Sequence, residues 1–266
     1  MRRAALLLAV APLALAACGS TSSSSSQTTT MTPSASLKQA ALKSAQASSE
    51  HVEMKGAASV QGQQVLITGA GDFDSASRRG QMQAHASVSG LDVQIDEVLD
   101  GTTIYMKSPL FSAALPNGKT WLKLDLQKFG QSKGIDFNQL LTQNPAQSFA
   151  QLKASGQVKE IGDETIDGAE TTHYRAHIDP AKIPQGAKIQ ALTNAKYGPY
   201  DVWVGKDDGY IHRTKNTYSY SAPGVGRQAA SMTMDFSDFG KDVTVTVPPA
   251  DETVDATDKT INGLGG

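Results

Sequence analysis

The feature that most constrains the fold is a run of segments in which apolar and polar residues alternate, each ending at a short turn sequence. Six such segments follow Glu50, at residues 52–60, 65–73, 79–88, 91–99, 103–107 and 121–126. The first five are separated by Gln61-Gly62, Asp74-Ser75, Ser89-Gly90 and Asp100-Gly101. Alternation with a period of two is typical of half-buried strands, and two-residue turns join antiparallel neighbours. The pattern therefore predicts an antiparallel meander.

A second series of alternating segments occupies the C-terminal half, at residues 158–165, 171–178, 200–204, 210–220, 229–239 and 243–247. Helical periodicity occurs at residues 36–49, with Ser34 or Ser36 as the capping residue, and again at 136–141, 145–153 and 180–192. The prediction is one α+β domain in which about eleven strands form the sheet and three or four helices pack on it.

Charge and cysteine content exclude some classes of protein. The 24 Lys+Arg and 26 Asp+Glu residues give a net charge of −2, and no basic run exceeds Arg2-Arg3 and Arg78-Arg79. The basic surface of a nucleic-acid-binding protein is therefore absent, and we expect no nucleic-acid partner. The one cysteine, Cys18, has no partner for a disulfide, so the fold rests on its core alone.

The N-terminus has the pattern of an export signal. Arg2 and Arg3 precede a 12-residue apolar stretch at 4–15, which is too short to span a bilayer. Leu15, Ala16, Ala17 and Cys18 follow, and this sequence resembles the bacterial lipobox. The resemblance implies that Cys18 becomes the mature N-terminus and carries a diacylglycerol thioether, whose two acyl chains give stable anchoring. We therefore expect a lipid-anchored protein on the extracytoplasmic face of the cell membrane.

Composition divides the chain into four parts. Residues 1–17 form the predicted lipoprotein signal peptide. Residues 18–36 hold the lipidated cysteine and a Ser/Thr-rich stretch with too little apolar surface to fold, which predicts a flexible tether. The folded domain is expected at 37–258, and residues 259–266 form a short flexible tail.

Three stretches carry a resemblance to a known family: residues 166–175, residues 200–204 continuing through 209–213, and residues 245–250. They resemble the mycobacterial LppX/LprA/LprF/LprG lipoproteins and their actinobacterial relatives. The resemblance implies a LolA-like fold, a strongly curved antiparallel sheet that forms a half-barrel capped by helices. It also implies that the protein holds lipids or lipoglycans in an apolar cavity. None of the three stretches contains a catalytic signature.

Apolar residues inside the predicted strands are the expected cavity wall, and several are methionines, whose flexible side chains suit variable apolar ligands. The wall residues are Met54, Ile67, Met82, Ile95, Ile104, Met106, Leu122, Leu124, Val202, Met232 and Met234. The same methionines are equally compatible with filling an irregular core. Because the side-chain period is two, a register slip of one residue reverses the face that a strand presents.

Sequence motifs for other chemistry are absent or are better explained by turns and strands. There is no Gly-x-Ser-x-Gly elbow, so we expect no catalytic residues and no enzyme activity. On one strand, His173 and His177 stand about 13 Å apart, too far to bind one metal ion, so no metal and no cofactor are expected. Asp207-Asp208-Gly209 is typical of a hairpin turn. His173 and Arg175 share one strand face, expected to be solvated, and Thr172 and Tyr174 share the other.

The leading hypothesis is a membrane-anchored lipoprotein that binds a lipid or glycolipid and carries it toward the outer envelope. Its expected partners are the lipid ligand, the membrane and a membrane transporter or envelope protein. Two alternatives stay open. One is an RseB-like sensing module that acts by binding a protein, and the other is a structural lipoprotein whose cavity is filled by its own side chains.

Overall fold

The computed structural model describes residues 31–60, 63–88, 90–112, 115–116, 118–133, 158–177, 196–222 and 226–263. The folded unit begins at Met31. The predicted signal peptide, the lipobox-like residues Leu15 to Cys18, the predicted tether up to residue 30 and the predicted helices at 136–141, 145–153 and 180–192 lie outside the described residues.

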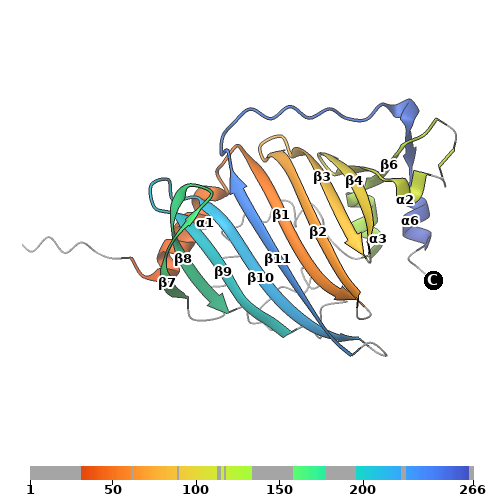
Figure 1. Ribbon diagram of the computed structural model, residues 1–266. Coiled ribbons are helices and arrows are strands. Elements are labelled where there is room, and N and C mark those ends of the chain that lie inside the picture. Colours follow the sequence, from red (N-terminus) through yellow and green to blue (C-terminus); the bar gives the residue numbers. More distant parts are fainter. Residues whose placement is uncertain are drawn as a thin grey trace, which may run out of the picture. The chain divides into compact units, whose positions relative to one another are not determined.

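Twelve strands form one open, curved sheet in the order β12-β6-β5-β4-β3-β2-β1-β11-β10-β9-β8-β7 (Figure 1). The strands are β1 (Ser49–Val60), β2 (Gln63–Asp74), β3 (Arg79–Val88), β4 (Leu91–Asp100), β5 (Thr103–Lys107), β6 (Trp121–Asp125), β7 (Lys159–Ile166), β8 (Ala169–His177), β9 (Lys196–Gly205), β10 (Ile211–Ala222), β11 (Gly226–Ser237) and β12 (Thr253–Asp255). The α+β curved sheet predicted from the sequence is confirmed.

Turn chemistry explains why the strands match the alternating segments so closely. In the β2–β3 turn, the Asp74 carboxylate accepts hydrogen bonds from the backbone N–H groups of Ala76 and Ser77. Gly90 and Gly101 adopt φ values of +84° and +63°, which glycine tolerates without steric cost. Each turn therefore fixes where one strand ends and the next begins, and with it the strand register.

Two meanders, β1–β6 and β7–β11, join where β1 pairs with β11, with Met54 opposite Met234. This antiparallel pairing links strands from opposite ends of the chain, so local alternation could not predict it. The sheet is mixed, because β12 runs parallel to β6 whereas the other neighbouring strands are antiparallel.

The predicted strand at 243–247 is wrong. Residues 241–249 are extended but make no ladder in the described structure, and we call them the strap. The strap leaves the end of β11 and runs past β1–β4 toward β12 (Figure 1). Apolar and polar residues do alternate in the strap. Pro248 and Pro249 follow directly, however, and they lack the backbone N–H groups that pairing with a neighbouring strand needs.

Helix α1 spans Pro33–Ser44, so the predicted 36–49 begins too late and ends too late. The cap is Thr32, whose side chain accepts a hydrogen bond from the Ala35 N–H, and Pro33 suits the first turn. The predicted tether, 18–36, thus overlaps the first turn of α1. The helix ends before Ser49, where the backbone enters the β1 ladder.

Helix α1 packs on the sheet and forms the main buried cluster of the described residues. Leu37, Ala40 and Ala41 contact Val202 and Ile211, and the Ile211 N–H donates to Ser44 Oγ at 2.9 Å. The alanines allow close approach of helix and sheet, while Leu37 supplies most of the buried apolar area. This contact fixes the helix over one end of the sheet.

Shorter helices lie at the β6 end: α2 (Pro109–Ser112), α3 (Leu126–Lys133), the 3-10 turn η4 (Ala250–Glu252) and α6 (Thr257–Gly263). The flexible tail predicted at 259–266 is corrected, since α6 includes its first residues and contacts α3 and β6. The Thr257 hydroxyl accepts from the Asp125 N–H and ties α6 to the sheet. None of the described helices combines the length and apolar character needed to cross a membrane.

Candidate functional site

All eleven predicted wall residues lie on one face of the sheet, which we call the apolar face. Directly paired residues share a face, and Met54 pairs with Met234 on one side and with Gly69 on the other. The chain of pairs continues from Gly69 through Ala84 to Ile95. The other eight follow by pairing and by steps of two along each strand: Ile67, Met82, Ile104, Met106, Leu122, Leu124, Val202 and Met232. The same face also carries Val52, Val65, Val93, Leu99 and Phe236.

Two glycines shape the centre of the apolar face by making room for methionines. A Cβ at Gly56 would lie 3.2 Å from Met232 Cε, and a Cβ at Gly69 would lie 3.1 Å from Met54 Cε. Each methionine therefore lies over a glycine of the neighbouring strand. The glycines do not interrupt the apolar surface, since the methionine side chains cover them.

Burial differs along the apolar face. Val202 is 0% exposed beneath α1, whereas the other ten wall residues are only partly buried. Met232, for example, is only partly buried, although β1 and β10 flank it on the two sides. Within the described part of the chain, α1 closes one end of the face, and the remaining wall keeps apolar surface that a ligand can cover.

Two polar side chains on the apolar face were missed by the sequence analysis. Glu97 stands between Met82 and Met106, and burial raises the pKa of its carboxyl group. Asn216 stands between Met232 and Tyr200, and its buried Oδ1 atom has no hydrogen-bond partner among the described residues. The signal for Glu97 was present, because it occupies an apolar position in the alternation of residues 91–99.

The opposite face, called the polar face here, carries a row formed by Arg175, Asp201, Lys215, Thr233 and Lys55 across five strands. The row carries charged side chains of both signs, with three cations, one carboxylate and one threonine. Burial of apolar ligands on this face would strip water from these charges, so the two faces differ sharply in chemistry.

The expectation of a solvated face at His173 is wrong. His173 is 5% exposed, its ring nitrogens lie 2.9 Å from Glu164 Oε1 and 2.9 Å from Asp201 Oδ1, and its ring stacks on Trp203. Asp201 also accepts a hydrogen bond from Arg175 Nε at 2.7 Å. The carboxylates on neighbouring strands satisfy the imidazole, which explains its burial.

His177 is exposed at the end of β8, away from this cluster. Across the described ranges, no group of three or more His, Cys, Asp or Glu side chains is arranged to hold a metal ion.

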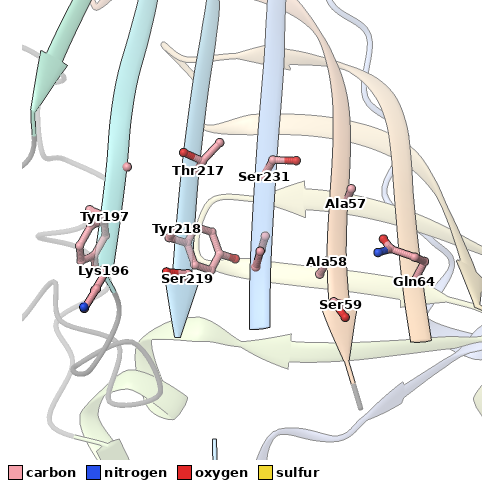
Figure 2. A pocket seen from close by; sticks show the side chains of 13 residues that line it. Ala57, Ala58, Ser59, Gln64, Lys196, Tyr197, Thr217, Tyr218, Ser219 and Ser231 are labelled. Atoms are coloured by element: carbon pink, nitrogen blue, oxygen red, sulfur yellow. The ribbon is translucent and has the colours of Figure 1, made fainter. Parts of the chain in front are cut away.

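Several hollows lie on the polar face of the described part of the chain, and the two larger ones differ in their lining. One, of about 520 Å³, is lined mostly by small side chains, with Gln64, Lys196, Tyr197 and Tyr218 beside them, near the far ends of β9, β10, β11, β1 and β2. Figure 2 shows Thr217, Ser231 and Ala57 lying across three neighbouring strands. The other, of about 540 Å³, lies between the strap and strands β1–β4 and β6.

Among solved structures, LprF from Mycobacterium bovis aligns with a TM-score of 0.53 at 15% identity, covering 82% of this chain and 97% of LprF. The fold is that of the LppX/LprF-type lipoproteins. The resemblance drawn from the sequence motifs is thereby confirmed for the fold. LppX from Mycobacterium tuberculosis aligns at 17% identity with a TM-score of 0.48, covering 80% of this chain and 98% of LppX.

Sequence relatives come from Streptomyces. An uncharacterized 31.2 kDa protein of Streptomyces griseus, encoded between rplA and rplJ, is 29% identical over 159 residues, which are 54% of this chain and 50% of that protein. The candidate lipoprotein SCO4650 of Streptomyces coelicolor is 26% identical over 142 residues, 52% of this chain and 43% of that protein. The chain thus spans about half the length of these relatives. No protein-family model matches it.

Proposed function

We propose that this chain is a membrane-anchored, extracytoplasmic lipoprotein that binds a lipid or glycolipid on its apolar face and carries it toward the outer envelope. Binding occurs by burial of acyl chains, and no covalent chemistry takes place. The observation that carries the proposal is the convergence of all eleven wall residues on one face, where ten keep part of their surface exposed.

The physical chemistry of the apolar face suits an acyl chain. Each buried CH₂ group contributes about 0.8 kcal/mol, so a ligand with two long chains gains enough to offset the loss of its own freedom. Methionines at the centre adapt to chains of different shape. Glu97 and Asn216 supply the few polar points that orient a ligand in an otherwise apolar site.

The anchor and the location rest on the N-terminal sequence and on the relatives. Leu15-Ala16-Ala17-Cys18 resembles a lipobox, and one Streptomyces relative is named as a candidate lipoprotein. In this proposal the acyl groups on Cys18 hold the folded unit close to the membrane from which it takes its ligand. A membrane transporter or envelope protein would supply or accept that ligand.

Mass spectrometry of the full chain tests the proposal. The protein is produced in an actinobacterial host, extracted in detergent and weighed under native and denaturing conditions. We expect a lipid mass present at about one per chain only in the native spectrum, while the anchor mass persists after denaturation because it is covalent. Equal native and denatured masses would overturn the proposal and favour a structural lipoprotein that holds no ligand. A copurifying protein on an empty chain would overturn it in favour of sensing.

A further inference from the structure

The hollow between the strap and the sheet is a second site with its own chemistry. Its walls are formed by β1, β2, β3, β4 and β6, mostly through polar-face side chains, and its roof is formed by residues 246–249. Alternation places these side chains opposite the apolar face, because Gln83 adjoins Met82, Asp96 adjoins Ile95, and Asp72 pairs with Gln81 on the other side of Met82. We call this hollow the strap groove.

The strap is fixed at both ends, so the groove exists before any ligand arrives. At one end, the Gly240 N–H donates to the Ser49 carbonyl at 3.0 Å, and the Ser49 hydroxyl donates to the Lys241 carbonyl. At the other end, Thr253 Oγ1 donates to the Pro249 carbonyl at 2.7 Å. Pro248 is buried, so the roof is seated on the sheet. A preformed groove avoids the entropy cost of ordering a loop on binding.

Planar polar groups line the groove and are already oriented. His51 Nδ1 lies 2.7 Å from Asp72 Oδ1, and Gln83 Nε2 donates to Asp96 Oδ1 at 3.1 Å. Each carboxylate keeps further lone pairs, and Gln81 stands exposed beside them. The groove therefore offers both donors and acceptors at fixed positions.

An aromatic ring closes one end of the groove. Trp121 projects from β6 on the polar face, and Lys107 Nζ lies 5.7 Å from the centroid of its ring. The floor near it includes Val98, which is buried. An apolar aromatic surface beside a row of polar side chains suits a ligand with both kinds of surface.

The charges that line the strap groove disfavour anions, a metal ion and acyl chains as its ligand. No lysine or arginine is among the described lining residues, whereas the carboxylates of Asp72 and Asp96 are, so the groove disfavours phosphates and carboxylates. Asp72 and Asp96 stand two strands apart, about 10 Å, which is too far to share a metal ion. Acyl chains would desolvate the carboxylates.

We propose that the strap groove binds a short neutral saccharide. Sugar hydroxyls donate to Asp72 and Asp96 and accept from Gln81 or Gln83, while the C–H face of a pyranose ring packs on Trp121. The volume of about 540 Å³ is within the usual range for small-molecule pockets. This site is independent of the lipid proposed for the apolar face, which lies on the other side of the sheet.

The two tryptophans of the chain make a direct test possible. Trp121 lies at the groove, and Trp203 is buried in the His173 cluster. The full chain, labelled with ¹⁵N at the indole, is studied by NMR in a detergent without a sugar headgroup. Trp121→Phe assigns the two indole signals. Maltotriose, cellotriose and mannotriose are the probes, each raised to about 10 mM to detect millimolar dissociation constants.

We expect at least one trisaccharide to shift the Trp121 signal saturably and leave the Trp203 signal in place. Asp96→Ala should weaken this binding by about tenfold. Lys55→Ala, on the same face but outside the groove, should bind as the wild type does. An unchanged Trp203 signal shows that each variant is folded. Failure of all three probes to shift Trp121, or an undiminished shift in Asp96→Ala, would overturn the proposal.

Discussion

Glu97 occupies a position that β4 otherwise gives to apolar side chains, and its surroundings set how it titrates. Met82 and Met106 flank it on the neighbouring strands, and burial raises its pKa above the ordinary value of 4.5. Burial likewise raises the pKa of Glu50, which lies at the end of the same face. Both carboxyl groups bind protons more tightly in the folded chain than in the unfolded chain.

Replacing Glu97 by glutamine therefore has a pH-dependent effect. In the wild type, the free energy of unfolding falls as the pH rises from the unfolded pKa near 4.5 through the raised folded pKa. Glu97→Gln mimics the neutral acid, so it should be more stable than the wild type at pH 7, and the difference should vanish below about pH 4.5. Urea unfolding at both pH values measures this. Glu53→Gln, exposed on the polar face, should match the wild type at both; a stability gain at pH 7 that persists in acid would contradict the account.

The side-chain amide of Asn216 is a second polar group whose burial destabilises the fold. Its Oδ1 atom is buried beside Met232 and has no partner in the described part of the chain, which costs free energy in the absence of a ligand donor. Asn216→Leu should raise the unfolding free energy of lipid-free protein by about 1 kcal/mol. Lys215→Leu, on the exposed face of the same strand, controls for the change in β propensity. A loss of stability specific to Asn216→Leu would show that the amide has a partner.

At the scale of elements, the docking of α1 depends on one large side chain. Leu37 is 2% exposed against Val202 and Ile211, whereas Leu42 on the same helix is 37% exposed. Leu37→Ala should lower the unfolding free energy by about 2 to 4 kcal/mol, and Leu42→Ala by less than about 1 kcal/mol. Urea denaturation of the two variants gives the comparison. Equal losses would mean that the helix does not dock through Leu37.

The elements also show what a sequence can and cannot predict. Strands β3 and β5 coincide with their predicted ranges, because turn residues such as Asp74 and Gly101 fix the strand ends locally. The β1–β11 pairing and the parallel β12 depend on tertiary packing and have no local signal. The start of α1 was misplaced because Thr32, Ser34 and Ser36 are all suitable caps. Pro33 favours Thr32 as the cap, since proline suits the first position of a helix.

At the scale of the molecule, one sheet presents two surfaces of different chemistry. The common face of the eleven residues could be predicted, since turn positions set which residues of each strand point to the same side; that this face binds a ligand stays a prediction. The strap groove could not be predicted, because it exists only where residues 241–249 cross the sheet. The strap has strand-like alternation, and only the fold shows that it pairs with nothing in the described structure.

The central claim is that the apolar face holds the lipid, and a pair of adjacent charge substitutions tests it. Met232→Glu places a carboxylate on the apolar face, whereas Thr233→Glu places one on the polar face between Lys55 and Lys215. The measurement is the number of noncovalently bound lipids per chain by native mass spectrometry, with circular dichroism to confirm folding. The account predicts wild-type lipid content for Thr233→Glu and a fall of about tenfold or more for Met232→Glu, because the carboxylate must be desolvated. Full lipid content in a folded Met232→Glu chain would contradict it.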